Sequence, residues 1–185
     1  MGRLRHFDRK SVLQKAMPVF WKRGYADTSV QDLEKATGVN KSGLYAEFKN
    51  KEDLFIECLK FYYETRTARK VLEREPLGWR NIQTFLVQVS QSSTAELKGC
   101  FGVATMRELD QLPPEARSII IKYRNKLKQL WAKNIAAEKT HQSPQAIAEL
   151  LSTFFSGFCI NQNLKISKAS LVRQVEDFVA ALKAL

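Results

Sequence analysis

The sequence has little of what marks a secreted or membrane-bound protein. Its three cysteines are far apart and outside any CxxC or Cys/His metal spacing, so neither a disulfide scaffold nor a metal site is expected. No apolar run approaches the roughly 20 residues that span a bilayer. The basic N-terminus, MGRLRHFDRKS, lacks an apolar signal core and a small-residue cleavage site. We therefore expect a cytoplasmic protein with no membrane partner, no metal and no cofactor.

Signals for β-strands are also missing. β-Branched residues do not cluster in alternating runs, and no Asn-Gly or Asp-Gly hairpin turn occurs. Apolar residues recur instead at helical spacing, which predicts an all-α fold of about nine helices. The expected helices cover about 8–23, 28–38, 41–48, 51–72, 79–92, 99–109, 115–139, a stretch from 144 onward, and 168 to the C-terminus. Pro18 should kink or loosen the first of them.

Basic residues outnumber acidic ones, and the excess is concentrated near the N-terminus. The chain has 30 Lys and Arg against 19 Asp and Glu, a net charge of +11. Residues 1–51 hold eleven basic and five acidic side chains, which is more than half of the excess. This surplus favours a polyanionic partner at the N-terminal end. Its sign alone fits an acidic membrane or ribosomal RNA equally well.

A helix-turn-helix is predicted over residues 29–48. Two short helices meet at Thr37-Gly38-Val39-Asn40, where the glycine permits a tight turn. Thr28 or Ser29 is placed to cap the first of these helices, and Asp32 suits its first turn; Asn50 is placed to cap the helix that follows the motif. Apolar residues are spaced to pack the two helices together. The remainder of the second helix carries donors and small side chains that suit a major groove.

The run TSVQDLEKATGVNKSGLYAEFKNKEDLF, with the preceding FWKRGYADT, resembles the DNA-binding signature of the TetR family of regulators over about residues 8–65. The resemblance implies an all-α homodimer that binds a palindromic double-stranded operator through two N-terminal units. It implies a helix-turn-helix DNA-binding domain over 8–66 and an effector-binding and dimerisation domain over 67–185. Residues that would enter or flank the major groove are Lys41, Ser42, Gly43 and Tyr45, and those that would grip phosphates are Thr28, Tyr45, Lys49 and Lys51.

A regulator of this type would bind a small effector in its C-terminal part. The candidate lining residues are apolar or aromatic, which indicates an apolar or aromatic effector. They are Phe61, Phe85, Val89, Met106, Tyr123, Leu127, Trp131 and Phe158. Ordinary core packing explains each of them as well, because aromatic stripes at helical spacing are usually core.

The last two helices look too apolar to be covered by one chain. A four-helix dimer interface would bury them. The residues expected in that interface are Leu151, Phe155, Phe158, Val175, Phe178 and Leu182.

Cys100 is a separate candidate. It follows Gly99 at the expected start of a helix, where the helix N-terminus and Lys98 would lower a thiol pKa, so it is a possible redox or electrophile sensor. A small buried hydrophobe is the alternative interpretation.

The leading hypothesis is a ligand-responsive repressor that is not an enzyme. A redox- or electrophile-sensing regulator acting through Cys100 is the alternative. A small helical hydrolase or transferase is poorly supported, because His6 and His141 lie in a terminus and a loop with no nucleophile or paired carboxylates at a suitable spacing. A basic structural or RNA-binding protein would have dispersed basic residues and no compact turn motif.

Overall fold

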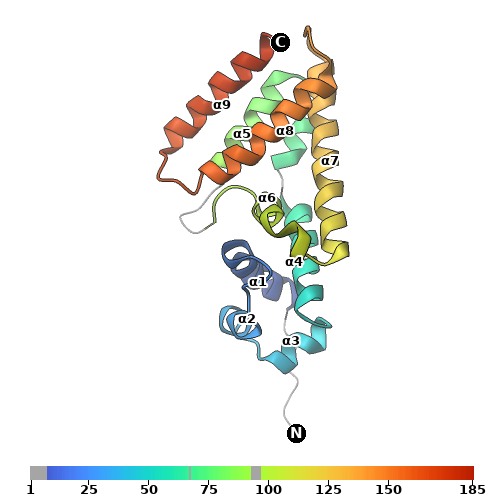
Figure 1. Ribbon diagram of the computed structural model, residues 1–185, viewed down its shortest axis with the longest axis vertical. Coiled ribbons are helices and arrows are strands. Elements are labelled where there is room, and N and C mark those ends of the chain that lie inside the picture. The colour runs from blue at the N-terminus through green and yellow to red at the C-terminus, as the bar shows by residue number, and fades with distance from the viewer. Residues whose placement is uncertain (1–7, 67, 93–96) are drawn as a thin grey trace. The chain divides into compact units, whose positions relative to one another are not determined.

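The computed structural model describes residues 8–66, 68–92 and 97–185. In this part of the chain the backbone forms nine α-helices and two 3-10 helices, η1 and η2, and no strand (Figure 1), so the predicted all-α fold is confirmed. The helices are α1 Arg9–Arg23, α2 Val30–Thr37, α3 Lys41–Glu47, α4 Lys51–Thr65, η1 Ala68–Glu73, α5 Trp79–Gln91, α6 Phe101–Thr105, η2 Met106–Gln111, α7 Pro114–Ala136, α8 Pro144–Asn161 and α9 Lys168–Lys183.

The chain divides into two compact units. The N-terminal unit takes the chain up to Thr65 together with Thr105–Ile119, and the C-terminal unit takes Arg66–Ala104 and Ile120–Leu185. The sequence places a domain boundary near residue 66 but assigns 105–119 to the second domain. In the structure this segment, which includes η2 and the first turns of α7, is part of the first unit.

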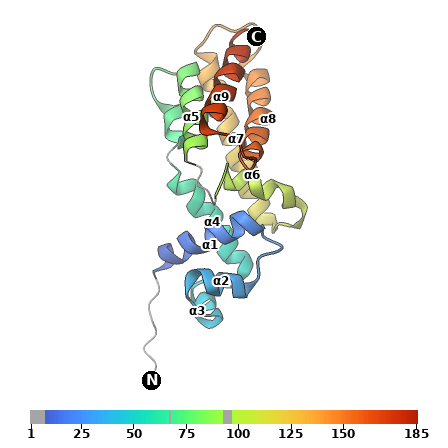
Figure 2. The same ribbon diagram turned by 90° about the vertical axis from the view of Figure 1, so that its left-hand side faces the viewer.

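Three helices of the N-terminal unit pack as a small bundle that carries α3. α1 lies against both α2 and α4, and α3 packs on α2 (Figure 2). Phe20 of α1 and Phe55 of α4 are fully buried, and their rings meet edge to face with centroids 5.1 Å apart. This core holds the two short helices of the turn motif, which are too short to be stable alone.

Local sequence signals set the starts of these helices. Ser29 and Asp32 form a reciprocal capping box at the N-terminus of α2. Asn40 accepts a hydrogen bond from the Gly43 amide at the start of α3, and Asn50 accepts one from the Asp53 amide at the start of α4. Helix α1 is assigned as one helix through Pro18.

Helix α4 is shorter than its sequence predicts. The apolar pattern extends to residue 72 without a Gly or Pro, yet α4 ends at Thr65 and the 3-10 helix η1 follows. Leu72 is buried in the core of the C-terminal unit, and its carbonyl accepts a hydrogen bond from Asn134. Tertiary contacts therefore override the local helical pattern here.

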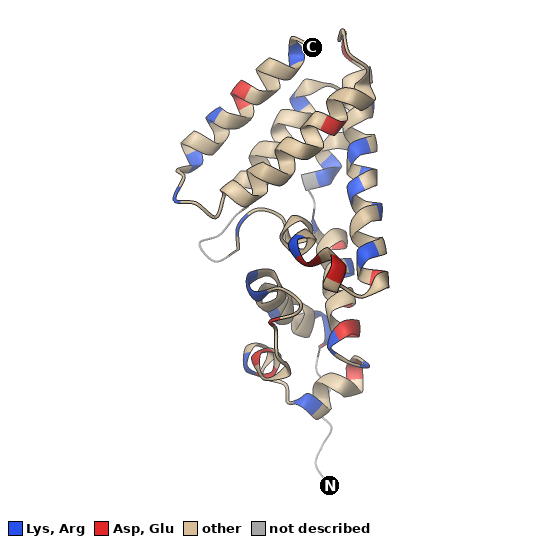
Figure 3. Ribbon diagram, viewed as in Figure 1, with Lys and Arg blue, Asp and Glu red and all other residues tan. Residues whose placement is uncertain are grey.

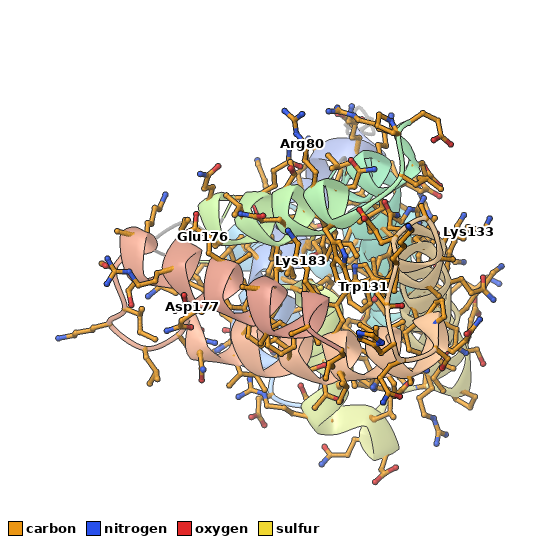
Figure 4. All side chains as sticks on the ribbon, turned by 90° about the horizontal axis from the view of Figure 1, so that it is seen from above. Arg80, Trp131, Lys133, Glu176, Asp177 and Lys183 are labelled. Atoms are coloured by element: carbon orange, nitrogen blue, oxygen red, sulfur yellow. The ribbon has the colours of Figure 1, made fainter. Side chains whose placement is uncertain are left out.

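The C-terminal unit is built around an aromatic core. Trp131 of α7 meets Phe85 of α5 and Phe155 of α8 with ring centroids 6.0 and 5.6 Å apart. α9 packs beside α5 (Figure 2). Figure 4 shows Trp131 enclosed by the helices, whereas labelled charged side chains such as Arg80 and Lys133 lie on the outside.

One buried amide joins three segments of this unit. Asn134 of α7 is completely buried, and its nitrogen donates to the carbonyls of Leu72 and Leu130. Its oxygen accepts from the Gly78 amide and the Asn81 side chain. All the hydrogen-bonding groups of the side chain are used, as a buried amide requires.

None of the helices in the described ranges is long and apolar enough to cross a membrane. Across the same ranges, no cluster of three or more His, Cys, Asp or Glu could hold a metal ion. His6 lies outside the described residues.

Candidate nucleic-acid interface

Helix α3 presents a polar face with small side chains. Lys41, Ser42 and Lys49, which follows the helix, are exposed, and Gly43 and Tyr45 are half-buried. Leu44 and Phe48 are almost completely buried and hold the opposite face against the bundle. The α3 surface therefore offers the donors and the lack of bulk that close approach to base edges requires.

The ends of α3 are fixed by side chains that the sequence does not mark. At its N-terminus the Lys41 amide donates to the Glu34 carboxylate of α2, across the turn. At its C-terminus Arg9 donates to the Glu47 carbonyl at 2.8 Å and lies 4.3 Å from the centre of the Phe48 ring. Arg9 also pairs with Glu57 of α4 at 2.8 Å. Arg9 thereby ties α1, α3 and α4 together.

Charged pairs also brace the neighbouring elements. Hydrogen bonds from the Ser29 side chain and amide, with the adjacent Arg23, lower the pKa of Asp32. Burial acts to raise the pKa of Glu57, but hydrogen bonds from Arg9 and Lys60 outweigh it and lower the pKa overall. Both carboxylates are therefore ionised at neutral pH, as their pairing with basic residues requires.

Two predicted phosphate contacts have other partners in the structure. Thr28 is almost fully buried, and its hydroxyl donates to the Gly24 carbonyl at 2.6 Å. The Lys51 ammonium donates to the carbonyls of Tyr25, Ala26 and Thr28 at 3.0, 3.4 and 3.0 Å. An ammonium has three N–H donors, so these bonds occupy all of them. The structure thus gives both side chains a role in holding the loop that precedes α2.

The other predicted DNA contacts share one surface. Lys41, Ser42, Gly43 and Tyr45 lie on α3, with Lys49 in the turn behind it. The Lys41 ammonium lies 6.0 Å from the centre of the Tyr45 ring. Sequence reasoning missed Arg9, Glu34 and Glu108, whose partners are 7 to 83 residues away along the chain. Only contact information could have found them.

The predicted effector residues separate into two groups. Phe85, Val89, Trp131 and Phe158 are buried together in the core of the C-terminal unit, and Leu127 packs against them. Tyr123 is also in that unit, and the Arg69 guanidinium lies over its ring, 5.9 Å from the ring centre. Phe61 and Met106 belong to the N-terminal unit. A single pocket within one unit cannot contain all eight.

A surface groove of about 550 Å³ lies elsewhere, between α7 and α8. Alanines and long polar side chains line it, and no predicted effector residue is among them. The lining residues are Asn125, Lys128, Gln129, Ala132, Lys133, Ala136, Gln145, Ala148 and Glu149. Lys128 and Glu149 pair across it at 2.8 Å. Lysines continue along the outer turns of α7 (Figure 3).

Most of the residues predicted for a dimer interface are buried within the single chain. Of the six residues predicted for it, all except the half-buried Phe178 are buried in the chain's own core: Leu151, Phe155, Phe158, Val175 and Leu182. Two exposed apolar residues lie on α8 itself, and a third follows it. Leu150 and Ile160 are each 50% exposed, and Leu164 in the following turn is 59% exposed. Gly157, between them, has open space around it.

Cys100 lies just before α6 and is partly exposed. A Cβ at the preceding Gly99, which has φ +73°, would come within 2.5 Å of the Cys159 carbonyl oxygen, so the two backbones touch. Burial, and secondly the nearby Cys100, raise the pKa of the Cys159 thiol. Cys58 is fully buried, and this burial raises its thiol pKa strongly. Of the three thiols, Cys100 is the most accessible.

Comparison with known proteins places the turn motif in a family. Residues 12–58 match the family model described as bacterial regulatory proteins, tetR family. The HTH-type transcriptional repressor ComR of Escherichia coli is 48% identical over 68 residues, which are 37% of this chain and 32% of ComR. The uncharacterized HTH-type transcriptional regulator YezE of Bacillus subtilis is 42% identical over 40% of this chain and 38% of its own length. The match thus covers only about a third of the length of either relative.

Solved structures match over nearly the full length. The TetR family transcriptional regulator CifR, as a cysteine mutant complexed with 26 bp double-strand operator DNA, is 28% identical, with a TM-score of 0.81, over 97% of this chain and 99% of that chain. The reduced form of E. coli NemR is 19% identical, with a TM-score of 0.77, over 95% and 94%. At that identity, NemR shows the shared fold alone.

Proposed function

The chain belongs to the TetR family of bacterial regulatory proteins, and from this premise we propose that it is a repressor that binds a palindromic operator as a homodimer and is released by a small effector. The exposed polar face of α3, held on its opposite side by Leu44 and Phe48, carries the proposal. The names of two relatives support it: ComR is a repressor, and CifR was solved on operator DNA.

Lys41, Ser42, Gly43 and Tyr45 are the proposed groove contacts, and Tyr45 and Lys49 the proposed phosphate contacts. Lys51 and Thr28 are assigned an indirect role, since their donors hold the loop before α2. Net charge contributes a general attraction to DNA that salt weakens.

Removing the Tyr45 or Lys41 side chain should weaken operator binding by about tenfold or more, because each loses a groove or phosphate contact. The measurement is a mobility shift at two salt concentrations, using a duplex selected from a random-sequence pool. Lys139→Ala removes the same charge as Lys41→Ala, but from an exposed position in the C-terminal unit, and serves as its control. Equal wild-type affinity for random DNA and RNA would sink the proposal and favour a general nucleic-acid-binding protein.

A homodimer is supported by the apolar outer side of α8. Leu150, Ile160 and Leu164 are three of the four large hydrophobic residues found exposed in the described parts of the chain. Large exposed apolar side chains gathered on one element favour a protein–protein contact. We propose that this face, rather than the buried residues expected from sequence, meets a second copy of the chain.

The effector is proposed to be an aromatic or apolar molecule that carries a hydrogen-bond acceptor. The Trp131 indole is 1% exposed, and nothing in the described structure accepts a hydrogen bond from its N–H group. A buried donor without an acceptor is unfavourable, so a ligand acceptor that reached it would be bound more strongly. Phe85 and Phe155, which contact the indole, would supply the apolar surroundings.

A second kind of signal is proposed for Cys100, as the most accessible thiol. The mobility-shift assay distinguishes release by thiol modification from release by a bound effector. Release of operator by an electrophile such as N-ethylmaleimide should be lost in Cys100→Ser and kept in Cys58→Ser. Reversible release by acceptor-bearing aromatic compounds should be weakened in Trp131→Phe and kept in Cys100→Ser. Unchanged electrophile release in Cys100→Ser would exclude the thiol sensor, and unchanged ligand release in Trp131→Phe would exclude the indole contact.

A further inference from the structure

The loop Gly24–Thr28, between α1 and α2, is held by side chains of opposite charge from two distant parts of the chain. The Glu108 carboxylate of η2 accepts hydrogen bonds from the amides of Tyr25 and Ala26, at 3.2 and 2.9 Å. The Lys51 ammonium donates to carbonyls of the same loop. The Glu108 carboxylate therefore accepts hydrogen bonds from N–H groups of the loop, and the Lys51 ammonium donates to its C=O groups. These hydrogen bonds satisfy backbone N–H and C=O groups of the loop that have no partner in a helix or strand.

Gly24 leaves room for this arrangement. Its φ is +88°, a value that favours glycine, and a Cβ at this position would overlap the Glu108 carboxylate. The Tyr25 ring lies 4.6 Å from the Lys51 ammonium and 4.9 Å from the centre of the buried Phe55 ring. Burial, and secondly Glu52, raise the pKa of Tyr25, which keeps its phenol neutral. The loop is thus fixed on several sides.

The loop leads directly into the turn motif. Ser29, the residue after it, is the N-cap of α2, and α3 packs on α2. A change in the backbone conformation of the loop would therefore shift α2, and α3 with it. Glu108 reaches the loop from the segment that directly follows α6 in the chain, 82 residues beyond Ala26.

We propose that Glu108 is a positioning residue for operator binding, which acts by fixing the backbone of loop 24–28 and not by touching DNA. This inference rests on the proposed function. The predicted change in operator affinity is opposite to that expected for an ordinary surface carboxylate. Neutralising an ordinary surface carboxylate of a DNA-binding protein should raise affinity, because a repulsion with phosphate is lost. Neutralising Glu108 should lower operator affinity, because the loop loses its anchor.

The test compares Glu108→Gln with Glu115→Gln. Both variants lose one negative charge from the N-terminal unit, but Glu115 pairs with Lys60 on the surface, at 3.1 Å, and does not contact the loop. A glutamine at 108 can accept from only one of the two amides. Loss of a charge-assisted hydrogen bond of this kind corresponds to about tenfold weaker operator binding. We expect that loss for the selected operator duplex, and unchanged or tighter binding of a random duplex. Glu115→Gln should bind both at least as tightly as wild type.

Hydrogen exchange supplies a readout independent of DNA. The Tyr25 and Ala26 amides should exchange faster in Glu108→Gln and at the wild-type rate in Glu115→Gln, with matching circular dichroism showing that both variants fold. Operator affinity of Glu108→Gln at or above wild type would overturn the inference while leaving the proposed function intact. If wild type itself prefers no sequence, the proposed function fails and the inference falls with it.

Discussion

Replacing Asn134 with aspartate is expected to lower the melting temperature of the C-terminal unit by more than about 10 °C. The two side chains have nearly the same shape, so the effect is chemical. An aspartate would turn an oxygen toward the carbonyls of Leu72 and Leu130, which now accept from the Asn134 nitrogen at 2.8 and 2.9 Å. It would also place a charge where the side chain is completely buried. Together these costs are on the order of 4 kcal/mol.

Thermal unfolding followed by circular dichroism measures this effect. Asn125→Asp is the matched control, because Asn125 lies exposed on the same helix and the substitution introduces the same charge. The control should melt within a few degrees of wild type. Equal melting temperatures for the two variants would show that the buried amide does not join η1, α5 and α7 as described.

The double substitution Leu150→Asp, Ile160→Asp is expected to produce a monomer that binds operator about a hundredfold or more weaker than wild type. Each side chain is half exposed in the single chain, so the fold should tolerate a carboxylate. Across a self-complementary interface each carboxylate would be buried near its own copy. A monomer has only one helix-turn-helix unit. It therefore loses the gain in affinity from binding two half-sites at once, which typically exceeds a hundredfold.

Sedimentation equilibrium gives the mass, and a mobility shift gives the affinity. Ile121→Asp places the same charge on a residue of α7 that is 49% exposed, and it should remain dimeric and bind as wild type does. A double variant that stays dimeric would move the interface away from this side of α8. A monomeric wild type would exclude the dimer altogether.

Features written in neighbouring residues were predictable. The turn at Gly38, the hydroxyl cap of α2 and the cap by Asn50 each depend on a few consecutive positions. The same holds for the surface of α3, since apolar spacing identifies the buried Leu44 and Phe48 and leaves the remainder exposed. Local chemistry decides these features, and a single sequence contains it.

Features that depend on distant contacts were not predictable. Helix α8 is apolar on both sides, so periodicity could not tell the buried Leu151 and Phe155 from the exposed Leu150 and Ile160. Lys51 has the charge and location of a phosphate contact, but its carbonyl partners become visible only once the loop is folded. Nothing near Glu108 in sequence indicates that it belongs to the N-terminal unit.

The discontinuity of the N-terminal unit limits how this protein could be recombined. A chimera joined at Thr65 would keep residues 12–58, which match the family model. It would discard Glu108, the Lys60 partner Glu115, and the buried Leu112 and Ala116. A transplant intended to preserve operator binding should therefore carry residues 105–119 from the same parent, although they lie outside residues 12–58, which match the family model.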